Sequence, residues 1–154
     1  MNNKRKVNLN DVVECIEFEG ELLTHYYNKK TGIIIYIEDS STATYKAEDI
    51  NNIENFEEWE RELINSLYHF KKNPDDYIQL PTHDYIDEHG IMIEFSNKIE
   101  DSEVRNIILA NENSIRELRN AIEKAGLINE WYDYRECAER DLAIKWCNDN
   151  NIEY

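Results

Sequence analysis

The chain has 154 residues, a length typical of one domain, and its 41% apolar content is enough for a buried core. The formal net charge is −16, from 33 acidic residues against 17 Lys and Arg. This charge repels phosphate backbones and anionic membrane surfaces, so it argues against nucleic acids and membranes as partners. Only 4 Gly and 2 Pro are present, which argues against disorder and β-rich repeats.

The N-terminal segment predicts a short helix followed by a β-hairpin. Asn10 is the expected N-cap of the helix, and Gly20 is expected to close it. Residues 22–37 are rich in β-branched and aromatic side chains, and Gly32 lies in the short loop between the two arms, where it can adopt a positive φ. The second arm, 33–37, contains four Ile and one Tyr. Such a continuous apolar run predicts a strand that is covered on both faces.

A single domain, 1–154, is expected to have a β-rich subregion at about 7–50 and a helical subregion at about 55–150. The boundary between them falls within 38–55, where the apolar pattern changes. Residues 41–47 are a candidate third strand, although the pattern there is short. No repeat, low-complexity tract or long linker interrupts the chain, so these subregions are expected to pack as one body.

The next segment predicts two helices separated by a short extended stretch. The first has one apolar face, made of residues spaced by three and four positions: Phe56, Trp59, Leu63, Leu67 and Phe70. Pro74 ends this helix because proline has no N–H to donate. Residues 77–81 are expected to be extended. Pro81 is then expected to begin a second helix that continues to Ile99.

The last third of the chain predicts three helices with clear end signals. Residues 101–111 form the first, which starts at a capping Asp or Ser. Ser114 and Glu117 have the spacing of a capping box at the start of the second helix, and Gly126 is placed to end it. The third helix covers about 128–149. These elements complete a bundle of four to five helices.

The three cysteines predict a reducing environment. Cys15, Cys137 and Cys147 are odd in number and include no C-x-x-C pair, so a disulfide framework is not expected. On one straight helix Cys137 and Cys147 lie roughly 15 Å apart along the axis, too far to share a zinc ion. No apolar run approaches the length of a membrane span, and the N-terminus is polar. A cytoplasmic location is therefore expected.

The densest group of polar side chains lies in "PTHDYIDEHG", residues 81–90. His83, Asp87, Glu88 and His89 are the catalytic candidates, since two His with carboxylates can bind Zn, Mn or Fe or supply an acid–base pair. However, His83 and His89 are six positions apart, which turns them about 120° from a common side of a helix. Acidic residues in a first helical turn also stabilise the helix dipole. No metal or cofactor is predicted.

Aromatic side chains of the last helix provide a second set of candidates. Trp131, Tyr134, Arg135 and Trp146 are the binding candidates, but Trp131 and Trp146 share an apolar stripe typical of a core helix. Arg135 lies near this stripe and is expected to pair with a carboxylate, its aliphatic stem against a Trp. The chain has 10 Tyr against 4 Phe, which favours a protein-binding surface because Tyr tolerates partial exposure.

Four motifs of this chain resemble those of the bacterial uncharacterised protein family 0158, and the similarity spans most of 7–154. The motifs are "Y-x-x-L-P", "M-x-x-F", "I-x-x-x-W-Y-x-[FY]-R" and a final "I-x-W-C-x-x-N-x-I-x-[YW]". The residues that carry them are Tyr77, Leu80, Pro81, Met92, Phe95, Trp131, Tyr132, Tyr134, Arg135, Ile144, Trp146, Cys147, Asn150, Ile152 and Tyr154. The resemblance implies a bacterial protein but no particular activity.

The sequence therefore predicts an α+β fold, in which a small N-terminal antiparallel β-sheet with a short leading helix precedes the C-terminal bundle. The strong negative charge and the many tyrosines favour a non-enzymatic protein-binding or regulatory module that acts on a basic protein partner, and self-association remains open. The alternative is a metal-dependent or acid–base enzyme that uses the cluster from His83 to His89.

Overall fold

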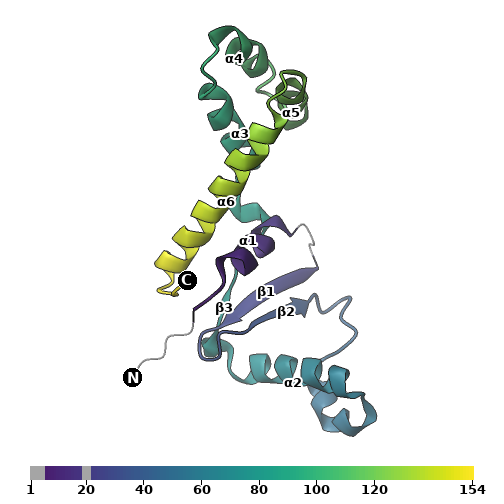
Figure 1. Ribbon diagram of the computed structural model, residues 1–154. Coiled ribbons are helices and arrows are strands. Elements are labelled where there is room, and N and C mark those ends of the chain that lie inside the picture. The colour runs from purple at the N-terminus through teal and green to yellow at the C-terminus, as the bar shows by residue number, and fades with distance from the viewer. Residues whose placement is uncertain (1–5, 19–21) are drawn as a thin grey trace.

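The computed structural model describes residues 6–18 and 22–154, and it has the predicted α+β architecture (Figure 1). The elements, with 3₁₀ helices labelled η, are α1 (Leu9–Glu17), β1 (Leu23–Asn28), β2 (Ile34–Glu38), η1 (Ala47–Asn55), α2 (Glu58–Lys72), η2 (Pro74–Asp76), β3 (Tyr77–Gln79), η3 (His83–Tyr85), α3 (Glu88–Asn97), α4 (Ser102–Leu109), α5 (Ile115–Lys124) and α6 (Ile128–Asp149). The sheet has the order β2-β1-β3, and α1 and α2 lie on opposite sides of it. The bundle consists of α3 to α6.

Helix α1 begins two residues earlier than predicted. Its N-cap is Asn8, whose side-chain oxygen accepts a hydrogen bond from the backbone N–H of Asn10 at 2.9 Å. Asn10 therefore lies in the first turn, and the prediction that it caps the helix was wrong. Val12 and Ile16 are fully buried on one face, which fixes the helix against the sheet and α6. The predicted closing residue, Gly20, lies outside the described residues.

The predicted β-hairpin is confirmed, and its loop explains the register. Gly32 has a φ of 75°, a conformation that favours glycine because a Cβ would be strained there. The buried side chain of Asn28 accepts hydrogen bonds from the backbone N–H groups of Lys30 and Thr31, at 2.9 and 3.1 Å. This turn sets Tyr26 opposite Ile35 in the ladder.

Side chains of the sheet alternate between two covered faces. Tyr27 is 2% exposed and packs with α1 and α6 residues, together with Ile78 of β3. Tyr26 points to the other face, where its ring centroid lies 4.5 Å from that of Phe70 on α2. Phe70 also contacts the ring of Tyr77 at 5.1 Å. The C-terminal part of α2 is thus attached to the sheet by aromatic packing.

Strand β2 is an edge strand and is only partly covered. Ile34 packs against the buried core, but Ile33 and Tyr36 are 59% and 48% exposed. The prediction that the whole run 33–37 is covered on both faces was therefore wrong. An apolar run alone does not distinguish a central strand from an edge strand.

The third strand is β3, and the prediction of a strand at 41–47 was wrong. Asp39 makes a turn directly after β2, since its side chain accepts a hydrogen bond from the N–H of Ser41 at 2.9 Å and its carbonyl accepts one from Ala43. The chain therefore leaves the sheet there. The sheet is completed by β3, which pairs antiparallel with β1. This strand was expected to be extended but to lie apart from the sheet, within the helical subregion at about 55–150.

Helix α3 starts later than predicted. Pro81 does not begin it; a 3₁₀ turn from His83 to Tyr85 follows, and the helix begins at Glu88. Its N-cap is Asp87, whose carboxylate accepts a hydrogen bond from the N–H of Gly90 at 3.0 Å. This hydrogen bond favours a helix that begins after Asp87 over one that continues through Asp87 from Pro81.

The other helix ends follow the predicted signals. Asp101 caps α4, and the hydroxyl of Ser114 accepts a hydrogen bond from the N–H of Glu117 at 3.3 Å at the start of α5. Gly126 follows α5 with a φ of 77°, as expected for a helix-ending glycine. Helix α6 covers the predicted range 128–149.

Two buried clusters form the interior, and α6 contributes to both. The sheet core comprises Val7, Val12, Cys15, Ile16, Tyr27, Leu80, Ile86, Ala143, Trp146, Cys147 and Ile152. The bundle core comprises Met92, Phe95, Ile108, Leu118, Ile122 and Trp131. Helix α6 therefore joins the two parts of the molecule. Within the described ranges, no helix is both long and apolar enough to cross a bilayer.

Candidate functional site

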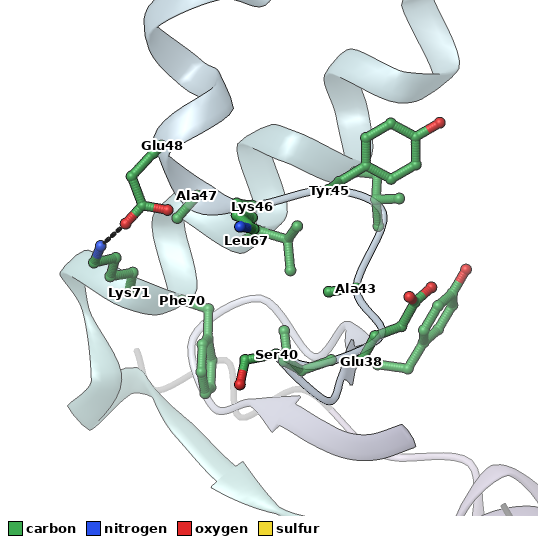
Figure 2. A pocket seen from close by; sticks show the side chains of 13 residues that line it. Glu38, Ser40, Ala43, Tyr45, Lys46, Ala47, Glu48, Leu67, Phe70 and Lys71 are labelled. Carbon is green, nitrogen blue, oxygen red and sulfur yellow. Dashed lines mark hydrogen bonds and ion pairs between the residues drawn. The ribbon is translucent and has the colours of Figure 1, made fainter. Parts of the chain in front are cut away.

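A groove opens between β2 and α2, and we call it the β2–α2 groove (Figure 2). Its volume is about 360 Å³. Thirteen residues line it: Tyr36, Ile37, Glu38, Ser40, Ala43, Tyr45, Lys46, Ala47, Glu48, Leu63, Leu67, Phe70 and Lys71. Most of this lining is aliphatic or aromatic, so the groove offers an apolar surface that remains accessible to a partner.

The groove lies next to the aromatic contact that attaches the C-terminal part of α2 to the sheet. Phe70 packs on the sheet near the C-terminus of α2, while Leu63 and Leu67, one and two turns earlier, line the groove. Segment 39–46 and η1 form the other wall. An ion pair between Lys71 and Glu48 ties η1 to α2, as the dashed line in Figure 2 shows.

An aromatic cluster at Tyr45 borders the groove and is surrounded by carboxylates. The ring of Tyr45 lies 6.2 Å from that of Phe56 and 6.1 Å from that of Trp59, whose side chain is 60% exposed. The Tyr45 hydroxyl donates a hydrogen bond of 2.9 Å to Glu60. This bond, followed by burial and the charges of Glu60 and Glu38, raises the pKa of Tyr45. Negative charge is therefore concentrated beside exposed aromatic surface.

The segment that follows Tyr45 in the sequence is also acidic, and its first part forms a wall of the groove. The segment 48–62, "EDINNIENFEEWERE", contains seven acidic residues and one Arg. Only Lys46 and Lys71 add positive charge to the lining itself, and Lys71 is paired with Glu48. The apolar surface thus lies within a strongly negative environment, which favours a positively charged ligand.

A second group of ionisable side chains lies where α1, α3 and α6 meet, and we call it the junction cluster. It comprises Glu17, Glu88, Arg135 and Glu139. Arg135 donates to the carboxylate of Glu139 at 2.9 Å and forms an ion pair of 3.4 Å with Glu88. Glu139 is only 2% exposed, and its carboxyl group is hydrogen-bonded to that of Glu17.

The environment of Glu139 stabilises its neutral form. Burial, followed by the hydrogen bond and the charge of Glu17, raises the pKa of Glu139 to about 7, although the guanidinium of Arg135 opposes this. Two neighbouring carboxyl groups resist simultaneous ionisation. The junction cluster therefore changes its protonation near neutral pH, at the point where the sheet and the bundle meet.

The four catalytic candidates have different surroundings. Asp87 caps α3 and Glu88 pairs with Arg135. His89 is hydrogen-bonded to the carbonyl of Glu112 at 2.7 Å, and His83 belongs to the separate turn η3. In the part of the chain that the structure describes, no group of three or more His, Cys, Asp or Glu side chains is arranged to hold a metal ion.

The four binding candidates also separate into packing and polar roles. Trp131 is 1% exposed in the bundle core, and Trp146 is buried in the sheet core. The hydroxyl of Tyr134 accepts a hydrogen bond from Lys98 at 2.9 Å. Arg135 pairs with carboxylates, as its sequence context predicted. Of this set, only Arg135 belongs to a group of interacting charges.

Sequence reasoning missed the residues that shape both sites. The stripe through Trp59, Leu63 and Leu67 was recognised, but Leu63 and Leu67 line the groove and Trp59 is exposed. Glu139 follows Arg135 by four positions, a spacing that could have identified it as the predicted carboxylate partner. Glu17 gave no such signal, because its proximity to Glu139 depends on the packing of α1 against α6.

The comparisons with known proteins identify the family and no activity. The model of the Uncharacterised protein family (UPF0158) matches residues 6–154, essentially the whole chain, and the chain belongs to this family. No curated protein and no solved structure matches the chain. The family assignment agrees with the motifs seen in the sequence, and any function has to be argued from the geometry of this chain.

Proposed function

We propose that this family member is a non-enzymatic protein-binding module of the bacterial cytoplasm, which acts on a basic protein partner. In this proposal the β2–α2 groove holds apolar side chains of the partner, and the surrounding carboxylates attract its Lys and Arg side chains. The observation that carries the proposal is the apolar groove of about 360 Å³ beside an acidic wall.

The chemistry of the groove supports a basic partner over an acidic one. Burial of apolar surface in the groove provides affinity that is roughly proportional to the area removed from water. Glu38 and Glu60 lie near Tyr45, so a cationic side chain there is stabilised by charge and by the exposed ring of Trp59. With a net charge of −16, the whole molecule also steers basic proteins toward itself.

Synthetic peptides test this proposal directly. We use a fluorescent peptide of about ten residues that alternates valine and lysine, and a matched peptide that alternates serine and lysine. Fluorescence anisotropy at about 50 mM salt should show binding of the valine peptide and much weaker binding of the serine peptide. Binding should weaken at about 500 mM salt, because salt screens the charges.

Two protein variants locate the binding site. Leu67→Asp places a charge in the groove and should weaken binding of the valine peptide at least tenfold. Ile107→Asp is the matched control, because Ile107 is 62% exposed on α4, away from the groove, and the change in net charge is the same. Equal binding to both variants, or no binding of the valine peptide at low salt, would contradict the proposed function.

A further inference from the structure

The outer edge of β2 has unpaired backbone groups. The N–H of Asn28 donates to the carbonyl of Ile33 at 2.9 Å, and the N–H of Asp39 donates to that of Leu22 at 2.8 Å. In an antiparallel ladder, alternate residues of a strand are hydrogen-bonded to its neighbour. With this register, the two bonds show that the odd-numbered residues of β2 are the ones hydrogen-bonded to β1. The backbone groups of Ile34, Tyr36 and Glu38 therefore point away from the sheet. Within residues 6–18 and 22–154, no backbone hydrogen bond from outside the sheet reaches them.

Apolar or aromatic side chains border this edge on both faces of the sheet. On the α2 side, Ile37 opens onto the β2–α2 groove. On the α1 side, the rings of Phe18, His25 and Tyr36 form a row, with centroids 5.3 and 6.4 Å apart. Phe18 and Tyr36 are 38% and 48% exposed. A strand added to the edge would place alternate side chains against these two surfaces.

We propose that the basic partner binds by adding one β-strand to the open edge of β2, with one set of its alternate side chains in the β2–α2 groove and the other set over Tyr36. This inference rests on the proposed function and specifies its binding mode. Main-chain hydrogen bonds to Ile34, Tyr36 and Glu38 provide affinity, while the groove selects apolar side chains.

The charge of the molecule favours a partner strand over a second copy of this chain. Strand β2 lacks three features that block edge pairing: it contains no Lys, no Pro and no bulge. Pairing of two copies would bring together two molecules of charge −16. The same charge attracts a strand that carries Lys or Arg, since Glu38 is at the end of β2 and Glu60 is close to Tyr45.

Backbone methylation of the valine–lysine peptide tests the strand pairing. One analogue is N-methylated at every valine and the other at every lysine, which removes the N–H groups of one edge of the bound strand at a time. We expect one analogue to lose at least tenfold in affinity, about 1.4 kcal/mol, and the other to bind within about twofold of the parent peptide. Equal losses, or no loss in either analogue, would overturn the inference.

A pair of protein variants examines the same bonds from the other side. Tyr36→Pro removes one outward N–H without removing a bond to β1, a change that edge strands tolerate. Tyr36→Ala retains this N–H and is the matched control. Both variants lack the tyrosine ring, so the Pro variant should bind the peptide at least tenfold more weakly than the Ala variant because it also lacks the N–H, with circular dichroism checking the fold of both.

The outcomes separate this inference from the proposed function. If the parent peptide binds and Leu67→Asp weakens it, but methylation has no alternating effect, the groove binds the partner without strand pairing and only the inference fails. If the parent peptide does not bind at low salt, the proposed function fails. A dimer in sedimentation experiments that Tyr36→Pro dissociates would identify a second copy as the occupant and would also overturn the inference.

Discussion

The carboxyl groups of Glu139 and Glu17 are hydrogen-bonded to each other, although they come from the last and the first helix of the chain. Glu139 is almost fully buried, whereas Glu17 is exposed, so the pair connects the interior of α6 to the surface of α1. Arg135 and, through it, Glu88 on α3 face the same position. The pair is therefore a point where protonation affects the contact between the sheet and the bundle.

We predict that the free energy of unfolding falls as pH rises from about 4.5 to about 7. The fold holds the proton of Glu139 more tightly than the unfolded chain does, because the pKa of Glu139 rises from 4.5 to about 7 on folding. The contribution of Glu139 is therefore greatest at the low end of this window and is lost by its upper end, a change on the order of 3 kcal/mol. Urea unfolding across this range measures the change.

Glu139→Gln should remove this pH dependence, because glutamine resembles the neutral acid and does not ionise. The variant should be more stable than the wild type at about pH 8, and similar to it at about pH 5. Glu136→Gln, an exposed change on the same helix, serves as the control. Parallel stability curves for the wild type and Glu139→Gln would contradict this account of the junction cluster.

Arg135→Met should destabilise the protein more at about pH 8 than at about pH 5. Without the guanidinium, an ionised Glu139 remains buried next to Glu17, and breaking such a buried pair costs about 3–5 kcal/mol. At the lower pH Glu139 can hold its proton, so the loss should be smaller. The double variant Arg135→Met with Glu139→Gln should lose less free energy of unfolding than the sum of the losses in the two single variants. A double-mutant cycle by urea unfolding measures this difference.

The tryptophans should differ sharply in their contribution to stability. Trp131 is 1% exposed in the bundle core, and Trp131→Ala should lower the free energy of unfolding by about 3–5 kcal/mol. Trp59 is 60% exposed, and Trp59→Ala should change it by less than about 0.5 kcal/mol. Urea titrations of the two variants compare these values. Similar losses in both would show that α2 is packed more tightly than its exposure implies.

Among the three thiols, Cys137 should react fastest with a thiol reagent in the native protein. Cys137 is exposed, whereas burial and then the charges of Asp11 and Glu14 raise the pKa of Cys15 to about 11. Burial also raises the pKa of Cys147. A thiolate is the reactive form, so both buried thiols should label slowly until the protein is unfolded. Cys137→Ser should eliminate the fast phase of labelling; a persistent fast phase would show that a buried thiol is accessible.

The parts of the fold that sequence predicted were those with local signals. Ser114 and Gly126 determine the ends of α5 through interactions within a few residues, and the range of α6 follows from them. Residues 77–81 were correctly expected to be extended, but the pairing of Tyr77–Gln79 with the sheet was missed, because its partner β1 is far away in sequence. The start of α3 was misplaced because the capping by Asp87 was not recognised.

The candidate sites were less predictable because both depend on tertiary packing. Arg135 was correctly expected to pair with a carboxylate, but Glu17 and Glu88 reach its neighbourhood only when α1 and α3 pack on α6. Likewise, the stripe of α2 predicted a buried face. Leu63 and Leu67 of this stripe line the groove beside the contact of Phe70 with the sheet, which no local pattern encodes.

The separation of α1 and α6 in the sequence has a consequence for synthesis on the ribosome. The sheet core includes Ala143, Trp146, Cys147 and Ile152, and the backbone N–H of Val7 donates to the carbonyl of Glu153 at 2.8 Å. The hairpin and α1 emerge before α6 and lack these contacts until α6 has been translated. Since such long-range contacts form slowly, the N-terminal region should reach its native packing only after α6 has docked.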